Sequence, residues 1–432
     1  MKPGSVRKSL KYSLFDGLFT ALMLGVSETY LIPYGIALGA GPSQVALLAS
    51  IPPLVASLLQ VQSAALTQSI GSRMKLIRAV VFFHALAWLP IILIPFVFHA
   101  HPLWRPWALL AAGSVFVSFG AFGVPAWQSV MYDYLPLKKR GQYFGWRNRL
   151  QGALTVSASI SAGLLLNHFG KDSLTGFLAV FVFAMVCRFG AWACLFRQEE
   201  PYHHTRHDVY FSFLQFASQI RTSNFAKFVL FVSAMSFAVN VSAPMIALYL
   251  LDEIGYSYAA YMSVITAATF SVLMFQRGWG RIGDQRGNLR ILKIAGWGIA
   301  ALPALWIVSP RPEWLFVVQL FAGFFWGGWT LLVLNYIVEA VTPQKRIRSL
   351  SYFNVTNSVA VFLGAMTGGW LIHRLPPIKG HSFLTLFLLS CLCRLAVMVF
   401  FSGSVREVRK EAPGPVPMTA NEIKLSQSEV NP

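Results

Sequence analysis

Long apolar runs dominate the chain, and short polar stretches separate them. Each run is long enough to cross a bilayer as an α-helix, which takes roughly 20 residues. The runs are continuous and lack the two-residue alternation of a membrane β-barrel strand. The pattern therefore predicts an all-α integral membrane protein with twelve transmembrane helices. The predicted spans are residues 12–38, 44–69, 77–99, 105–135, 147–168, 174–197, 228–251, 258–279, 290–309, 313–341, 350–372 and 382–402.

The polar stretches divide these spans into two sets of six. We predict a first six-helix bundle over residues 1–197, a cytoplasmic linker over 198–224, a second bundle over 225–402 and a disordered cytoplasmic tail over 403–432. Phe213, Phe216 and Ile220 have helical spacing, which indicates a helix lying on the membrane surface within the linker. The linker histidines, at positions 203, 204 and 207, permit metal binding, but a solvated linker is the favoured interpretation.

Composition and charge support a membrane class. Charged residues make up 12% of the chain, against about 25% in soluble domains. The net charge is +19, and Lys and Arg concentrate in the N-terminal tail, the 2–3 loop and the 4–5 loop. Because this placement follows the positive-inside rule, we interpret it as topology and not as nucleic-acid binding. It predicts a multi-pass protein of the cytoplasmic (inner) membrane with both termini in the cytoplasm.

The two halves of the chain resemble each other. Matched landmarks occur in the same order: Gly71 with Gly287, Arg188 with Arg394, and Asn148 with Asn357. Two homologous six-helix halves are therefore expected, with a binding site at their interface near the bilayer midplane. Pro33, Pro125 and Pro244 are expected to permit bends in spans one, four and seven.

A charged stretch between predicted spans eight and nine, residues 280–290 (GRIGDQRGNLR), is predicted to be a short, tightly turning connector. Residues 64–73 form a weaker copy between spans two and three. The twelve spans, the repeat and these two stretches resemble the major facilitator superfamily, whose loop signature is G-x-x-x-D-x-x-G-x-[RK]-[RK]. The second copy supplies Gly280, Asp284, Gly287 and Arg290. The first keeps Gly71 and Arg73, with Ala64 and Gln68 in place of glycine and aspartate. Arg140 and Gly141 resemble the family's arginine–glycine signature after span four.

The resemblance implies two bundles that rock around a central cavity and move a small solute by alternating access. Under this interpretation the two loop copies, with Arg140 and Gly141, form a gate. Asp284 is expected at the N-terminus of a helix of the other half, where a carboxylate is stabilised, with Arg140, Arg147 or Arg286 as its partner. The alternative is that Asp284 only solvates a turn.

Glu28, near the centre of the first predicted span, is the candidate for proton coupling, because ionisable groups within membrane spans are costly and usually functional. The alternative is a structural glutamate paired with a hydroxyl or an arginine. Asp16, Asp133 and Glu339 are expected to pair with basic loops at the membrane interface. Arg188 and Arg394 are expected to snorkel or to form structural pairs.

Aromatic and amide side chains in several spans are candidates for lining an apolar cavity with a few polar groups. They are Tyr30, Tyr34, Trp127, Gln128, Asn240, Trp326, Trp329 and Asn335. The alternative is that the amides hold helices together and the aromatic rings mark membrane interfaces.

No nucleotide-binding loop, catalytic triad or metal-ligand set is evident, and Cys187, Cys194, Cys391 and Cys393 all lie in apolar runs. We therefore predict no enzyme activity and no cofactor. The expected partners are a small-molecule solute, protons and membrane lipids, with no nucleic acid, and the protein is expected to be a monomer.

The predicted function is secondary active transport of a small organic solute, proton-coupled, with a slight preference for export of amphipathic compounds. The family's proline-containing antiporter signature is absent from span five, which weakens the case for export. The alternatives are a proton-coupled importer of an organic acid, a peptide-like compound or a siderophore, a transport-dead sensor or scaffold, and a lipid flippase.

Overall fold

The computed structural model describes residues 3–135, 137–170, 174–201, 223–341 and 346–408. The side chains of residues 3–4, 28, 64, 132, 137–142 and 346–348 are not described. The predicted linker helix and almost all of the predicted disordered tail fall outside the described residues.

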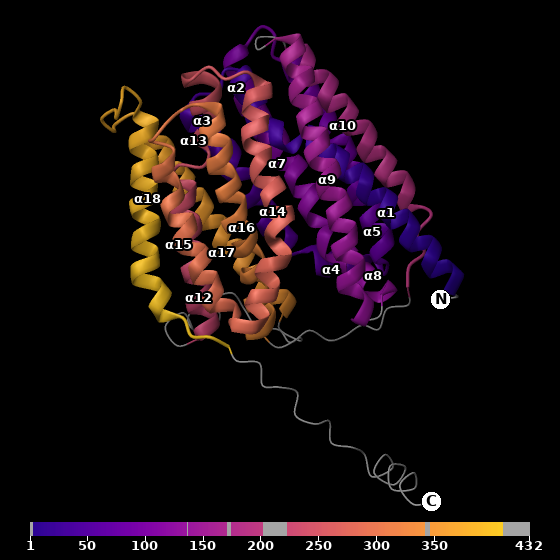
Figure 1. Ribbon diagram of the computed structural model, residues 1–432. Coiled ribbons are helices and arrows are strands. Elements are labelled where there is room, and N and C mark those ends of the chain that lie inside the picture. The colour runs from indigo at the N-terminus through magenta and orange to yellow at the C-terminus, as the bar shows by residue number, and fades with distance from the viewer. Residues whose placement is uncertain (1–2, 136, 171–173, 202–222, 342–345, 409–432) are drawn as a thin grey trace, which may run out of the picture.

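Helices account for nearly the whole described chain (Figure 1). The first half contains α1 (Pro3–Val26), η1 (Glu28–Tyr30), α2 (Leu31–Ala37), α3 (Pro42–Gln60), α4 (Ser63–Ile70), α5 (Arg73–Leu86), α6 (Trp88–Val97), η2 (Pro102–Trp104), α7 (Arg105–Phe122), α8 (Val124–Tyr134), α9 (Leu137–Phe169) and α10 (Leu174–Leu195). The second contains α12 (Asn224–Asn240), α13 (Met245–Leu248), η3 (Tyr249–Glu253), α14 (Tyr258–Arg286), α15 (Asn288–Leu305), α16 (Pro312–Ala340), α17 (Arg346–Leu371), α18 (Ser382–Phe401) and η4 (Ser402–Ser404).

These segments build the twelve predicted membrane-spanning units. Ten of the described units are long and apolar enough to cross a membrane, and several of them join two or three consecutive segments. The long helices α15 and α17 complete the set of twelve within the same bundle (Figure 1). The twelve-helix fold predicted from the apolar runs is confirmed.

The stretch from Gly280 to Arg290 differs from its prediction as a tightly turning connector. Helix α14 continues through it to Arg286, and only Gly287 leaves helical geometry, with φ of +96°. Gly280 and Gly283 face Leu331 and Leu332 of α16, so the extension is held by helix packing. The run of charged residues is typical of a loop in the sequence, but in the structure these residues occupy the exposed side of a helix.

Prolines break the spans where bends were expected. In span four the helix stops at Gly123, ahead of Pro125, which has no N–H to donate to the carbonyl of Ala121. The side chain of Gln60 donates to that carbonyl instead, at 3.0 Å. In span seven α12 ends at Asn240, ahead of Pro244.

Buried Arg394 holds the break in span seven. Its guanidinium donates to the backbone oxygen of Val239 at 3.4 Å, to Ser242 Oγ at 3.3 Å and to the backbone oxygen of Ile299 at 3.2 Å. The structural pairing predicted for Arg394 is thus satisfied by carbonyl and hydroxyl oxygens.

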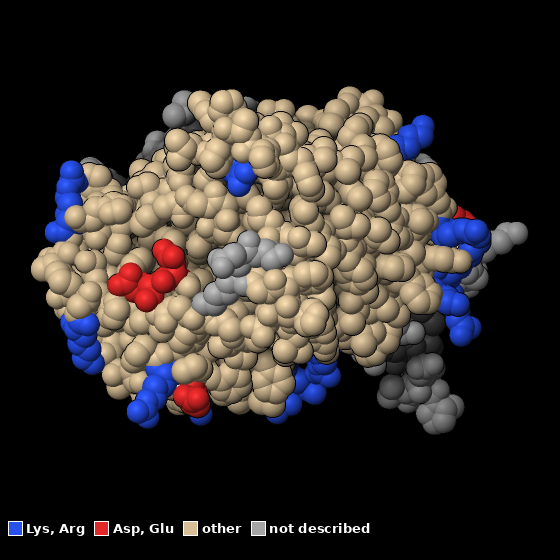
Figure 2. All heavy atoms as spheres, turned by 90° about the horizontal axis from the view of Figure 1, so that it is seen from above, with Lys and Arg blue, Asp and Glu red and all other residues tan. Residues whose placement is uncertain are grey.

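The two halves contact each other most closely at one end of the molecule. The end that carries the arginine-containing turns near Arg73, Arg290 and Arg406 is called the basic end below. At the opposite end, two apolar clusters contain residues of both halves, and in one of them the rings of Phe177 and Tyr258 meet at 5.4 Å. Toward the basic end the two halves have separate apolar clusters. Figure 2 shows the opposite end, where charged side chains are sparse.

Candidate functional site

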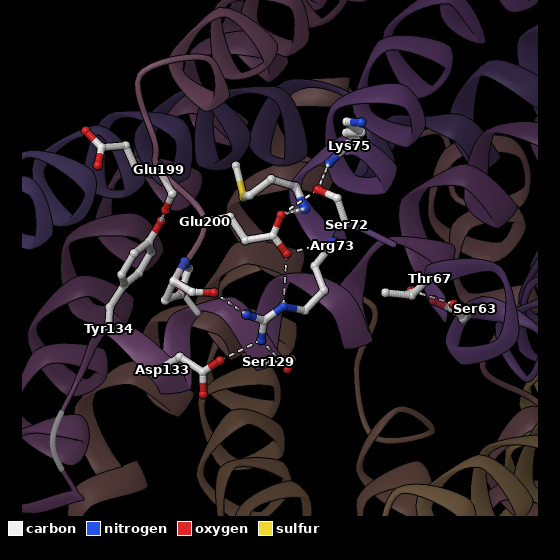
Figure 3. Close-up of polar contacts among 12 residues, drawn as sticks. Ser63, Thr67, Ser72, Arg73, Lys75, Ser129, Asp133, Tyr134, Glu199 and Glu200 are labelled. Atoms are coloured by element: carbon white, nitrogen blue, oxygen red, sulfur yellow. Dashed lines mark hydrogen bonds and ion pairs between the residues drawn. The ribbon is translucent and has the colours of Figure 1, made fainter. Parts of the chain in front are cut away.

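At the basic end of the first half, Arg73 joins three segments (Figure 3). Its side chain is only 4% exposed, and its Nη1 lies 2.6 Å from Asp133 Oδ2 of α8. Its Nε lies 3.3 Å from Glu200 Oε1, on the segment that follows α10. Nη1 also donates to Ser129 Oγ, and Nη2 to the backbone oxygen of Pro201. A planar guanidinium with several fixed donors suits such a multi-sided contact.

Glu200 also caps the start of α5. Its carboxylate accepts the backbone N–H of Arg73 at 2.8 Å and the hydroxyl of Ser72 at 2.5 Å. A carboxylate at this position is stabilised by the unpaired N–H groups and the positive end of the helix dipole. Burial alone would raise the pKa of Glu200, but these hydrogen bonds outweigh it and hold the pKa below its ordinary value.

The second half repeats this cap. Glu407, which follows α18, accepts the backbone N–H groups of Leu289 and Arg290 at 3.0 and 2.9 Å. The capped N–H groups of Arg73 and Leu289 are related by the same offset as the two loop glycines, since 289 − 73 = 216 and 287 − 71 = 216. Both glycines have positive φ. The φ of +96° favours glycine at Gly287, and a Cβ there would also lie 2.9 Å from the carboxylate of Glu407 and push on the cap.

The segments that carry the two caps are anchored alike. In the first half, the Tyr134 hydroxyl donates to the backbone oxygen of Glu199, whose N–H donates to Ser9. In the second, the Tyr336 hydroxyl donates to the backbone oxygen of Arg406, whose N–H donates to Asn224. Each segment therefore connects the first, third and fourth spans of its own half.

The halves differ in what stands beside the cap. Buried Leu289 occupies the position of Arg73, so the second half has no arginine equivalent there. It has instead an open pocket of about 660 Å³, which Asp284, Gly287, Arg290, Glu339 and Glu407 help to line. The second copy of the loop signature thus surrounds a pocket, whereas in the first Arg73 stands beside the cap and contacts Asp133 and Glu200. The gating role of both copies stays a prediction, and the side chain of Arg140 is not described.

A second charged cluster is buried inside the first half. Asp16 of α1, Arg147 of α9 and Arg188 of α10 are each less than 9% exposed. Both arginines interact electrostatically with Asp16. The guanidinium of Arg147 lies over the Trp127 ring, at 4.6 Å from its centre.

The sequence did not predict this burial of Asp16. The first span begins at Ser5, earlier than predicted, so Asp16 lies closer to the middle of Ser5–Ala37 than Glu28 does. Glu28 lies in the short 3-10 turn that interrupts this span, and its side chain is outside the described set. Asp133 does pair with a basic residue near the membrane interface, but this is Arg73 of the 2–3 region and not a residue of the 4–5 loop.

The aromatic candidates for the cavity have different environments. Tyr30 and Tyr34 are fully buried, and their hydroxyls donate to the backbone oxygens of Ser159 and Ile91. Trp329 is buried against Phe231, while Trp326 and Trp127 are half-buried. The rings of Tyr30 and Tyr34 therefore pack in the apolar cluster, shared by both halves, that also contains Phe177 and Tyr258.

The amide candidates are less buried. Asn240 donates to the backbone oxygen of Ser236 at 2.8 Å, Gln128 is exposed and Asn335 is half-buried. Their role in substrate binding stays a prediction. Among the described residues no cluster of three or more His, Cys, Asp or Glu side chains fits a metal ion. The histidines of the linker lie outside the described residues.

Sequence reasoning missed Glu200 and Glu407. Each follows the last span of its half, and 407 − 200 = 207 is close to the offset of the matched arginines, 394 − 188 = 206. A search for acidic residues at matching positions of the two halves would have found them. Their partners are backbone N–H groups, which carry no signal in the sequence.

The fold and these sites define a helical membrane transporter with two related halves. The sequence model of the Major Facilitator Superfamily matches residues 15–240 and 226–427, and the chain belongs to this superfamily. The protein is a multi-pass membrane protein and a secondary transporter by family, which points away from an enzyme.

Individual relatives are distant. The chain is 29% identical over 132 residues to the efflux pump azaK of Aspergillus niger, a match over 30% of this chain and 28% of that pump. It is similar in structure to the nucleoside transporter NupG, with a TM-score of 0.71, 12% identity, and coverage of 91% of this chain and 100% of that one. A D-xylose–proton symporter gives a TM-score of 0.69 at 10% identity, covering 94% and 99%. These structural similarities show the fold alone.

Proposed function

We propose that the protein is a proton-coupled transporter of a small organic solute in the cytoplasmic membrane, with the basic end in the cytoplasm. The observation that carries the proposal is the pair of acids in the first span, of which Asp16 is buried against two arginines. Ionisable groups inside a membrane are energetically costly, and where they occur they usually serve a function such as proton transfer. We assign coupling to Glu28 and include Asp16 as a second proton-binding candidate.

Coupling requires that the two ends of the molecule open in turn. In our proposal the two loop copies, with Asp284, Arg290 and Arg73, set the balance between the inward-open and outward-open states. Arg73 is tied to its own half, so the first copy stiffens one bundle. In the second copy Asp284 lines an open pocket, and in our proposal a side chain of the other half enters this pocket when the basic end closes.

The direction of transport is proposed to be export of an amphipathic compound, supported by the match to a fungal efflux pump. Import is the second candidate, supported by the similarity to a proton symporter for a sugar. A transport-dead sensor or scaffold remains the alternative from a different class.

Proton movement in proteoliposomes tests the proposal. Purified protein is reconstituted with a pH-sensitive dye inside the vesicles, and neutral amphipathic compounds, organic acids and nucleosides are added in turn. We expect one class to drive proton movement, and Glu28→Gln to abolish it. Uphill transport by Glu28→Gln with unchanged pH dependence would refute the role of Glu28, and the same result for Asp16→Asn would refute that of Asp16. No coupled proton movement with any solute would favour the transport-dead alternative.

A further inference from the structure

A cleft of about 180 Å³ lies between the two halves, enclosed by α3 and α7 of the first and α17 of the second. Val117 stands near the middle of the fourth span and Ser358 near the middle of α17, while Ser57 lies in the last turn of α3. The cleft is therefore close to the midplane and at the interface of the repeats, which is where a solute must be held during alternating access.

The chemistry of the lining is neutral and mixed. Val117 and small apolar residues are part of it, while Ser57, Gln60, Asn354, Asn357 and Ser358 supply hydroxyl and amide groups. None of the residues that the structure places around the cleft is charged. An ionised group entering it would lose its hydration without gaining a counter-charge, which costs several kcal/mol or more.

Two of the amides are already engaged. Gln60 donates to the backbone oxygen of Ala121, which Pro125 leaves without its helical donor. Its Oε1 accepts a hydrogen bond from Asn354 Nδ2 of the other half at 3.5 Å. The side-chain oxygen of Asn357, by contrast, is buried and has no hydrogen-bond partner among the described residues. A buried acceptor without a donor costs about 1–3 kcal/mol, and a bound hydroxyl or N–H group would recover this.

We propose that this cleft is a solute-binding subsite for an uncharged, hydroxyl- or amide-bearing group, with Asn357 as the hydrogen-bond acceptor and Val117 as part of the apolar wall. This inference rests on the proposed transport function and narrows its substrate to neutral amphipathic compounds. A volume of about 180 Å³ corresponds to roughly six water molecules at about 30 Å³ each. The cleft therefore receives one polar group or ring of a solute and not a whole large molecule.

Matched neutral and charged probes test the inference. Purified protein in detergent is titrated with phenyl β-glucoside and phenyl β-glucuronide, and with benzamide and benzoate, and binding is followed calorimetrically without any proton gradient. We expect the neutral member of at least one pair to bind, the charged member to bind at least tenfold more weakly, and Asn357→Leu to weaken the neutral probe about tenfold.

The control is Thr367→Val on the same helix, because the half-buried Thr367 side chain does not line the cleft and its hydroxyl donates to the backbone oxygen of Leu363. It should bind the neutral probe like the wild type. Ser358→Ala provides a second, milder variant of the cleft, expected to weaken binding if Asn357→Leu does not fold. The inference would be overturned if the charged probes bound equally well or more tightly, or if no probe bound at all. It would also be overturned if Asn357→Leu bound the neutral probe like the wild type or, where that variant does not fold, if Ser358→Ala did so. Binding as expected without proton-coupled flux would instead count against the proposed function alone.

Discussion

At the residue scale, Arg73 was expected to take part in a gate between the two halves. The contacts that the structure describes for its side chain are all with its own half. Its guanidinium is buried, whereas Asp133 and Glu200 are 36% and 28% exposed. Solvent therefore reaches the acids and moderates the loss when the arginine is removed. The contact connects the starts and ends of three spans in one half, and its geometry depends on the planar fork of arginine.

Replacing Arg73 by alanine is expected to destabilise the protein by about 2 kcal/mol, because several charge-assisted hydrogen bonds are lost together. Arg73→Lys keeps the charge but not the fork, so we expect it to lie between the wild type and Arg73→Ala. Melting temperatures in detergent measure both variants. A lysine variant as stable as the wild type would show that charge alone, and not the guanidinium geometry, holds the site.

At the scale of elements, the repeated caps explain how α5 and α15 begin. Each helix has its first N–H groups bonded to a glutamate that lies beyond the last span of its half. In each half, the segment that carries the glutamate also forms hydrogen bonds with a tyrosine hydroxyl and with a side chain of that half's first span. Because these contacts are within halves, they stiffen each bundle, which the proposed rocking of the two halves requires.

The Glu200 cap makes stability depend on pH in a defined direction. Its pKa is lowered in the folded protein, so its ionised form stabilises the fold above the ordinary pKa of 4.5, and this stabilisation is lost as the pH falls through the lowered value. Glu200→Gln has no charge to lose. We therefore expect the variant to be less stable than the wild type at about pH 7 and the difference to shrink toward about pH 3.5.

Melting curves of the two proteins across this range provide the measurement. Glu407→Gln serves as the parallel variant of the second half, where Leu289 stands at the position of Arg73. A difference between Glu200→Gln and the wild type that stays constant down to the acid end would contradict the assignment of the pH effect to Glu200.

At the scale of the whole molecule, the two halves pack closely at the end opposite the basic end, so the structure describes a state that is closed there. Gly369 of α17 lies against α3, where a Cβ would stand 2.9 Å from that of Ala46. Gly163 of α9 is similarly close to Met262 of α14. Glycines at these crossings let helices of different halves approach closely, which favours closure at this end.

Gly369→Leu is expected to strain the closed end by about 1–3 kcal/mol and to shift the population toward a state open there. Spin labels on cysteines placed at His101 and Arg311, in a protein whose four native cysteines are serines, report the distance between the halves. We expect longer distances in Gly369→Leu. Gly278→Leu, at an exposed helical position with open space around it, is the control. Identical distance distributions in all three proteins would refute the role of Gly369.

The sequence by itself determined the membrane class, the twelve helices, the repeat and the superfamily. The length of an apolar run and the placement of glycines are local features, so they can be recognised without knowing how the helices pack. It also located Gly71 and Gly287 at turns, since positive φ restricts the residue type there. It mistook the charged end of α14 for a connector, because the exposed face of a helix and a loop have the same composition.

Only the tertiary structure decided which polar groups meet. The burial of Asp16 between Arg147 and Arg188 depends on three helices far apart in the chain, and the caps by Glu200 and Glu407 depend on backbone N–H groups that every sequence possesses. The neutral cleft at Asn357 likewise exists only because α17 of one half crosses α3 and α7 of the other. Partners of a buried polar group are set by long-range packing, and a single sequence does not encode them in any local pattern.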